Sequence, residues 1–187
     1  YLAYRSQAKS FATFAGSTFD TLNLVVNGEP EGVQVSRVTA NYFTVLGVAP
    51  ALGRTFLPGE DEPGRDGVVV LSFWLWRDRF GRDPAVIGKT VLLNERSYEV
   101  VGVLPEEFRT PPTQPMGRLY MPYVMPTVTT PQTILNPIYS VARLKPGVTL
   151  GQAEAEVRTI NIEVNPAQAE YVKRVQAAVT AVDAQPE

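Results

Sequence analysis

Two neighbouring segments near the start of the chain alternate apolar and polar residues with a period of two. The first covers residues 22–26 and the second residues 33–39, and Asn27-Gly28 lies between them. A period of two sends alternate side chains to opposite faces of a strand, and Asn-Gly favours a tight turn. The pattern therefore predicts a β-hairpin, although the connection is longer than two residues.

The next segments combine short helices with a fully apolar strand. Residues 42–46 are expected to form a helix with Asn41 as its N-cap and Gly47 just past its end. Residues 68–71, Val-Val-Val-Leu, form a continuous apolar run, which is typical of a strand buried on both faces in the middle of a sheet. A second helix is expected over residues 72–80, with a capping serine at its start and a glycine directly after it.

The middle of the chain predicts a second hairpin and then a proline-rich stretch. Residues 89–94 and 97–104 are expected to be two strands joined by a tight turn. Eight of the 16 prolines fall in residues 105–137, and no charged residue occurs in residues 119–142. Proline removes a ladder donor, so we expect loop here, or an edge strand over residues 119–124 at most. The lack of charge indicates that the stretch packs against something.

The last third predicts strand, helix and strand. Residues 139–145 are the first strand, and residues 175–181 alternate as a closing strand. Thr149 and Gln152 have the spacing of a capping box. The helix is expected over residues 150–164, ending before Asn-Pro, with an apolar seam at Leu150, Ala153, Val157, Ile160 and Val164. Strand–helix–strand thus occurs twice, at 33–72 and 139–182, with a hairpin-rich insertion between, which indicates an α+β fold.

Composition removes several kinds of chemistry. The 187 residues contain no His and no Cys, which excludes Cys or His nucleophiles, a Ser-His-Asp triad, His or Cys zinc sites and disulfides. The formal net charge of −2 argues against a nucleic-acid partner, because such binding needs a basic face. No apolar run reaches the roughly 20 residues that a transmembrane helix needs. Because the chain begins at Tyr1 with no initiator Met, we expect a piece of a larger protein; if that protein is a membrane protein, its spans lie outside this piece.

Two acidic clusters and one aromatic helix are the candidates for chemistry. Glu60-Asp61-Glu62 offers oxygen ligands for a cation such as Ca²⁺, but it lacks calcium-loop spacing, so a solvated loop is the simpler interpretation. Glu106-Glu107 offers a carboxylate pair for glycoside hydrolysis, but neighbouring strand residues point to opposite faces. Residues 73–80 mix aromatic residues with arginine, as single-strand binders do.

Helical spacing divides the aromatic residues of that last segment. Phe73, Trp76 and Phe80 share one face and are expected in the core. Trp74 lies elsewhere, near Arg77, where a partly exposed tryptophan beside arginine is typical of an interface anchor. Core packing remains the alternative for Trp74. We therefore predict no catalytic, cofactor-binding or metal-ligating residue.

An ordered set of short phrases resembles a known family. The phrases are Thr39-Ala40-Asn41-Tyr42-Phe43, Leu46-Gly47-Val48-Ala49-Pro50, Leu52-Gly53-Arg54-Thr55-Phe56, Val68-Val69-Val70-Leu71-Ser72, Trp74-Leu75-Trp76, Arg79-Phe80-Gly81, Ile87-Gly88-Lys89-Thr90-Val91, Tyr98-Glu99-Val100-Val101-Gly102-Val103-Leu104-Pro105 and Val141-Ala142-Arg143-Leu144-Lys145-Pro146-Gly147-Val148-Thr149. From about residue 22 to the end, their order resembles the periplasmic core domain of MacB-like and FtsX-like ABC transporter permeases, especially the permease group abundant in acidobacteria.

This resemblance implies an architecture. The whole chain, 1–187, would be one extracytoplasmic region on the periplasmic side of the cell membrane, part of an integral membrane protein. A porter-like lobe of two strand–helix–strand units would cover about 33–82 and 138–183. A smaller, mostly β lobe would be inserted over about 83–137, and residues 1–32 are not assigned.

The resemblance also implies a function without catalysis in this chain. Such domains couple ATP hydrolysis in the cytoplasm to an extracytoplasmic protein partner (an adaptor, a carrier or a hydrolase) or to export, by mechanotransmission. The expected partners are the permease's own transmembrane helices, a separate ATPase subunit and a second copy in a dimer. Residues 119–137 and 57–67 are candidate partner surfaces, and deleting 126–135 is expected to spare folding but abolish coupling.

Two other function classes remain alternatives. The first is a self-standing extracellular ligand-binding module, with a cleft between two lobes lined by Trp74, Arg77 or tyrosines. The second is a carboxylate-dependent hydrolase, which requires two carboxylates facing each other in one cleft, at least one with a raised pKa.

Overall fold

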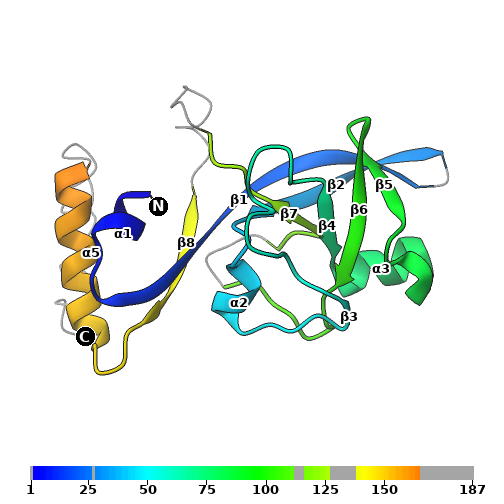
Figure 1. The fold of residues 1–187 in the computed structure, drawn as a ribbon. Helices are drawn as coiled ribbons and strands as arrows, with labels where there is room; N and C mark the ends of the chain where they lie inside the picture. The colour runs from blue at the N-terminus through cyan, green and yellow to red at the C-terminus, as the bar shows by residue number, and fades with distance from the viewer. Residues whose placement is uncertain (1, 27, 112–115, 127–137, 165–187) are drawn as a thin grey trace, which may run out of the picture. The chain divides into compact units, whose positions relative to one another are not determined.

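The computed structural model describes residues 2–26, 28–111, 116–126 and 138–164 (Figure 1). The helices of this part are α1 (Leu2–Gln7), α2 (Tyr42–Leu46), α3 (Phe73–Phe80), the 3₁₀ turn η1 (Pro84–Val86) and α5 (Leu150–Val164). The strands are β1 (Phe11–Val26), β2 (Glu29–Val38), β3 (Leu52–Gly53), β4 (Val68–Leu71), β5 (Thr90–Leu93), β6 (Arg96–Val103), β7 (Leu119–Pro122) and β8 (Tyr139–Leu144). The α+β class expected from the sequence is confirmed.

The chain divides into two compact units. The first combines Tyr1–Thr13 with Ala142–Glu187 and is called here the terminal unit; the second, Phe14–Val141, is called the sheet unit. These boundaries differ from those of the lobes expected from the sequence, 33–82 plus 138–183 and 83–137. Strands of both expected lobes are hydrogen-bonded to each other, since β4 pairs with β6 and β7. The division into a porter-like lobe and an insertion therefore stays a prediction.

Six strands of the sheet unit pair in a closed ring. The order β2-β7-β4-β6-β5-β1 is completed by the pairing of β1 with β2. Within the ring, the strand pairs β2–β7 and β4–β6 are parallel, and the other strand pairs are antiparallel. β3 adds to β6 outside the ring. Each strand of such a ring is hydrogen-bonded to a neighbouring strand on both sides, so none of the six is an edge strand.

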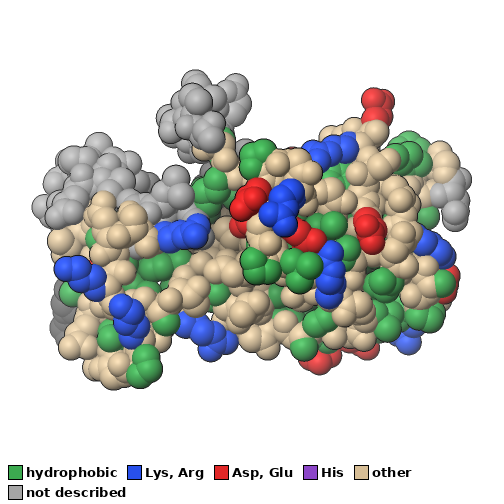
Figure 2. All heavy atoms as spheres, in the orientation of Figure 1, with side chains coloured by type: hydrophobic (Ala, Val, Ile, Leu, Met, Phe, Trp, Pro, Cys, Tyr) green, Lys and Arg blue, Asp and Glu red, His purple; other side chains and the backbone are tan. Residues whose placement is uncertain are grey.

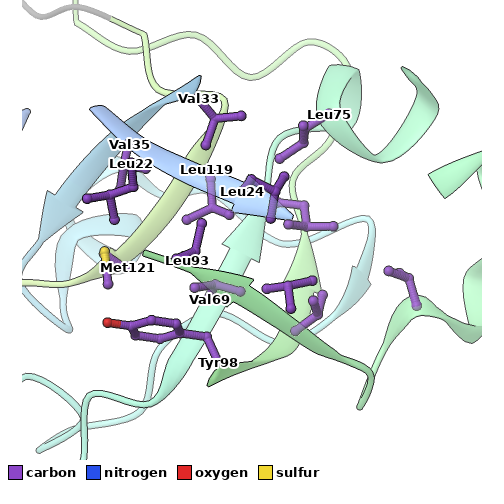
Figure 3. Packing of buried hydrophobic residues seen from close by; sticks show 14 of the residues in the cluster. Leu22, Leu24, Val33, Val35, Val69, Leu75, Leu93, Tyr98, Leu119 and Met121 are labelled. Carbon is purple, nitrogen blue, oxygen red and sulfur yellow. The ribbon is translucent and has the colours of Figure 1, made fainter. Parts of the chain in front are cut away.

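The larger hydrophobic core fills the ring. Alternate residues of the strands contribute to it, as the period of two requires, except in β6, where the register with β4 shifts after Val100 and the next core residue is Val103. Figure 3 shows their side chains converging between the strands. They are Leu22, Leu24, Val33, Val35, Val69, Leu71, Val91, Leu93, Tyr98, Val100, Val103, Leu119 and Met121. Leu75 of α3 and Val86 of η1 belong to the same core.

A second core lies on the outer faces of β2, β4, β6 and β7. It contains Val38, Val70, Val101 and Tyr120 from those strands, together with residues of α2 and the aromatic rings of Phe56 and Phe108. β4 thus has Val69 in one core and Val70 in the other. The expectation that residues 68–71 form a strand buried on both faces is confirmed.

The strand β7 corrects one expectation. Residues 119–122 were expected to be loop or edge strand, but β7 lies between β2 and β4, and all four of its residues are buried. Pro122 is tolerated because it is the last residue of the strand, and the amide of Tyr123 makes the next bond, to the Val38 carbonyl (2.8 Å). The expected packing of this stretch is confirmed for β7, and residues 127–137 lie outside the described residues.

Both predicted hairpins are present, but the expected longer connection in the first is wrong, because β1 extends to Val26 and β2 already begins at Glu29. β1 and β2 pair in an unbroken register from Ser17↔Val38 to Val26↔Glu29. β5 and β6 are joined by Asn94 and Glu95, with φ of 45° and 68°. Positive φ at both residues is the signature of the turn type whose twist suits a two-residue hairpin.

The two short helices agree with the sequence except at two positions. α3 begins at Ser72, whose hydroxyl accepts from the Leu75 amide (3.1 Å), and α2 ends at Gly47 in the left-handed conformation. Asn41 does not cap α2 through its side chain; its amide nitrogen instead donates to the Phe14 carbonyl (2.8 Å). The fully buried residue of α3 is Leu75, whereas Phe73, expected in the core, belongs to neither core.

The terminal unit is held by α5. The capping box is confirmed: the Thr149 amide donates to Gln152 Oε1 (2.9 Å), and the Gln152 amide donates to Thr149 Oγ1 (3.3 Å). Ala153 and Ile160 of the predicted seam are buried, but Leu150 in the first turn is 66% exposed. Glu156 accepts the amides of Lys9 and Ser10 (2.6 and 2.8 Å), and these bonds lower the pKa of its carboxyl.

Part of the sequence prediction for this unit falls outside the described residues. That applies to the helix stop at Asn165-Pro166 and to the closing strand at 175–181. The side chain of Val164, at the end of the predicted seam, is likewise outside the described part.

Candidate interaction surface

The acidic residues 60–62 do not gather around a common point. Glu60 turns inward, where its carboxylate accepts from the two Arg54 Nη atoms (2.9 and 2.7 Å) and from the Leu57 amide (2.8 Å). Asp61 accepts from the Ala40 amide (3.0 Å), and Glu62 pairs with Arg65. Each carboxylate therefore binds a different part of the protein.

These contacts make residues 57–67 a fixed loop on the sheet unit. Glu60 is 8% exposed, so its bidentate pair with Arg54 is sheltered from solvent on the carboxylate side. Asp61 joins the loop to the turn before α2. Leu57 is 50% exposed on this fixed loop, one of few large apolar side chains in the described residues that face solvent. Loop 57–67 therefore presents an apolar side chain in a fixed backbone setting.

No cluster that could hold a metal ion is found in the described part of the chain. No group of three or more acidic side chains there could hold a metal ion. Glu106 and Glu107 are both exposed beside the end of β6.

Burial raises the pKa of Tyr42 to about 12, so this phenol stays protonated at neutral pH.

Four charged residues join α3 to the sheet. Arg118, just before β7, contacts Asp78 of α3 (3.1 Å) and Glu31 of β2 (3.5 Å). Arg79 also pairs with Glu31, and the hydrogen bond from Arg77 lowers the pKa of Asp78, whose other cationic neighbours act in the same direction. α3 is thus held by ion pairs on its polar side and by Leu75 in the core.

The aromatic residues of α3 agree in part with the sequence prediction. Trp76 and Phe80 pack against the core within the ring. Trp74 lies elsewhere and is half-buried, and the Arg77 guanidinium lies over its ring at 4.6 Å from the centroid. The expected neighbourhood of Trp74 and Arg77 is confirmed.

A hollow of about 440 Å³ opens near the far end of α3. It is lined by Val25, Val26, Arg79, Phe80, Lys89, Thr90 and Val91. Neither Trp74, Arg77 nor any tyrosine is among its lining residues, so it differs from the cleft expected for a ligand-binding module. Both of its cations already have partners, Glu31 for Arg79 and Asp83 for Lys89.

In the part of Figure 2 that shows the sheet unit, acidic and basic side chains lie next to each other. This arrangement suits protein contacts better than binding to a phosphate backbone, which requires a continuous basic face.

Sequence reasoning missed the pairs that fix these surfaces. Arg54 and Glu60 meet across a turn in an irregular loop, and Arg118 and Asp78 are 40 positions apart. Neither spacing is a motif, so no local signal identifies them. Of the predicted partner surfaces, loop 57–67 is exposed at Leu57, whereas residues 119–122 are buried as β7.

Comparison with known proteins decides the family. The model of the MacB-like periplasmic core domain matches residues 2–160. The chain belongs to this family. A MacB-like periplasmic core domain is the part of an ABC transporter permease on the periplasmic side of the membrane, and none of the described helices is long and apolar enough to cross one.

Curated relatives of this MacB-like domain are longer proteins. It is 29% identical over 137 residues to the macrolide export ATP-binding/permease protein MacB of Shigella dysenteriae, an alignment that covers 73% of this chain and 21% of that protein. With MacB of Campylobacter jejuni it shares 29% identity over 103 residues, 54% of this chain and 15% of that protein. The chain thus spans about a fifth or less of the length of these relatives.

Solved structures share the fold. The periplasmic region of MacB from Actinobacillus actinomycetemcomitans has a TM-score of 0.67 at 19% identity, covering 97% of this chain and 80% of that one. The extracellular domain of the noncanonic ABC-type transporter YknZ from Gram-positive bacteria has a TM-score of 0.60 at 17% identity, covering 83% and 77%. These likenesses support the MacB-like fold.

Proposed function

We propose that this MacB-like domain couples ATP hydrolysis in the cytoplasm to an extracytoplasmic protein by mechanotransmission. The domain is joined to the transmembrane helices of its permease, works with a separate ATPase subunit and acts as one of two copies in the full transporter. Movement of the domain changes its contacts with the partner protein. A coupling of this kind requires different contacts in the two states of the transporter.

The observation that carries the proposal is the closed, stiff construction of the sheet unit. Six strands pair in a ring around one core, and a second core packs α2 against the outside. Close-packed interiors have low compressibility, so a body with two such cores resists deformation and transmits displacement. Such a body transfers a displacement from one end to a partner at another.

Loop 57–67 is the proposed contact with the partner. Arg54, Glu60 and Asp61 hold the loop before binding, so little conformational entropy is lost when a partner docks. Leu57, half exposed, supplies apolar area at the centre of this contact.

Replacing Leu57 by aspartate in the full-length permease is expected to reduce coupling at least tenfold. A carboxylate buried without a partner at an apolar contact lowers the affinity for the partner protein. The stability of the fold is expected to stay unchanged, because the Leu57 side chain is exposed. The measurement is complementation of a permease-deletion strain, together with ATP hydrolysis by the purified transporter. ATP hydrolysis is expected to continue while complementation is lost.

Leu92→Asp is the matched control. Leu92 is 40% exposed on β5 and is not a residue of loop 57–67, so its replacement is expected to leave complementation unchanged. Equal complementation by the Leu57 variant and the wild type contradicts the assignment of loop 57–67 as the partner contact.

A further inference from the structure

Two aromatic side chains of α3 lie outside both hydrophobic cores. Phe73 and Trp74 are half-buried and pack edge to face against each other, with ring centroids 5.6 Å apart. In the described part of the chain the indole N–H of Trp74 has no hydrogen-bond acceptor, whereas that of Trp76 donates to the Asp83 carbonyl (2.9 Å). Phe73 also packs on Trp76 (5.9 Å), so Phe73 and Trp74 lie at the border between core and surface, each partly exposed.

An arginine covers each of these rings. Arg77 lies over Trp74 at 4.6 Å, and Arg82 lies over Phe73 at 4.8 Å. Arg77 also binds Asp78, but among the described residues the Arg82 guanidinium has no ion pair and no hydrogen bond. Five donors of Arg82 thus face outward beside an aromatic pair. We call Phe73, Trp74, Arg77 and Arg82 the aromatic–arginine surface.

The backbone at Arg82 is unusual. Its φ is 59°, directly after Gly81 with the same angle. Glycine adopts this left-handed conformation freely, but a residue with a long side chain does so at a cost in energy. A strained residue whose guanidinium stacks on one ring, and has no ion pair or hydrogen bond among the described residues, points to a use for its donors outside the fold.

The charge of this region favours an acidic partner. Residues 73–89 contain four cations and two carboxylates, although the whole chain carries a net charge of −2. Both carboxylates are occupied, Asp78 by Arg77 and Arg118, and Asp83 by Lys89. Positive charge therefore remains at this surface. Recognition of anionic lipid takes a cluster of about four to eight Lys or Arg. The aromatic–arginine surface has Arg77 and Arg82, so a protein segment fits better than a membrane.

We propose that the aromatic–arginine surface binds an acidic, apolar segment of a partner protein. Carboxylates of that segment pair with Arg82 and Arg77, and an apolar side chain between them packs on Trp74. Trp and Arg are the residues that most often dominate interface energetics. The inference deepens the proposed function, on which it rests, because it states the chemistry of a partner.

The test measures binding of two labelled peptides to the whole chain. One peptide alternates leucine and glutamate, and the other has glutamine in place of every glutamate. The glutamate peptide is expected to bind at least tenfold more tightly at low ionic strength, and this preference is expected to shrink as salt is added. Equal affinity for the two peptides overturns the proposal.

Three variants identify the surface. Trp74→Ala and Arg82→Gly are each expected to weaken binding of the glutamate peptide at least fivefold. Arg82→Gly is also expected to keep or raise the Tm, since glycine relieves the left-handed strain, so loss of binding cannot be ascribed to unfolding. Arg158→Gln, which changes an exposed arginine on α5 outside both proposed contact surfaces, is the control and is expected to bind normally. Unchanged binding by the first two variants overturns the proposal.

A membrane is tested in the same variants. Vesicles that contain phosphatidylglycerol are expected to bind weakly and without regard to Trp74 or Arg82. Tighter binding to vesicles than to the glutamate peptide, lost in the same variants, overturns the assignment to a protein partner. The peptide assay measures binding without ATP, whereas the Leu57→Asp variant measures coupling in cells. Equal binding of the two peptides therefore contradicts the acidic partner at the aromatic–arginine surface, and normal complementation by the Leu57 variant contradicts loop 57–67 as the partner contact.

Discussion

Replacement of Phe43 by alanine is expected to lower the free energy of unfolding of the sheet unit by about 3–5 kcal/mol. Phe43 is fully buried in the second core, and its ring lies 5.4–5.9 Å from the rings of Tyr42, Phe56, Phe108 and Tyr120. Alanine leaves a cavity among four aromatic rings that cannot all move inward. The loss is a large share of the roughly 5–15 kcal/mol that stabilises a typical domain.

Urea denaturation followed by tryptophan fluorescence measures this effect. Both tryptophans, Trp74 and Trp76, lie in the sheet unit, so their fluorescence reports on that unit alone. Leu92→Ala, at an exposed position on β5, is the control and is expected to change stability by no more than about 0.5 kcal/mol. A loss below about 1 kcal/mol for Phe43→Ala contradicts the second core as a source of stability.

Replacement of Gly102 by alanine is expected to cost about 3 kcal/mol of stability through a backbone clash. A Cβ on Gly102 would clash with the carbonyl oxygen of Arg54, the residue directly after β3, which pairs with β6. No side-chain rotation relieves such a contact, so residues 51–54 must move away. That movement breaks the bond from the Arg54 amide to the Val101 carbonyl (2.8 Å) and displaces the arginine that holds loop 57–67.

Gly151→Ala provides a control of opposite sign. Gly151 lies in the first turn of α5, where an added Cβ meets nothing within 4 Å. Alanine is the better helix former, so stability is expected to stay equal or to rise by up to about 1 kcal/mol. Thermal unfolding by circular dichroism measures both variants. A Gly102 variant as stable as the wild type contradicts the close approach of β3 to β6.

Local features of the fold could be predicted because local chemistry determines them. Ser72 and the Thr149–Gln152 pair cap helices whatever surrounds them, and the turn at Asn94-Glu95 fixes the hairpin of β5 and β6. The apolar run of β4 predicted a strand buried on both faces, and in the structure Val69 lies in one core and Val70 in the other.

Long-range closure could not be predicted from the same signals. The ring depends on β7 entering between β2 and β4, whereas the many prolines of residues 105–137 indicated loop or edge strand instead. Sequence pattern shows which residues avoid water but not which strands become neighbours. Leu150 shows the reverse case, since it fits the apolar seam of α5 but is exposed at the first turn.

The candidate surfaces could be predicted only in part. Loop 57–67 was identified from its irregular composition, but the pairing that fixes it, Arg54 with Glu60, has no sequence signature. Trp74 beside Arg77 followed from helical spacing, whereas the stacked and otherwise unpaired Arg82 depends on a left-handed backbone beyond the helix.

The central claim is that this MacB-like domain moves in response to nucleotide on the other side of the membrane. Because the chain has no cysteine, Leu57→Cys introduces a single exposed site within it for a spin label. The distance between labels on the two copies is measured by pulsed electron paramagnetic resonance in the full-length permease with its ATPase. The account predicts different distance distributions in the nucleotide-free, ATP-bound and ADP-bound states. One unchanged distribution in all three states, while ATP is hydrolysed normally, contradicts it.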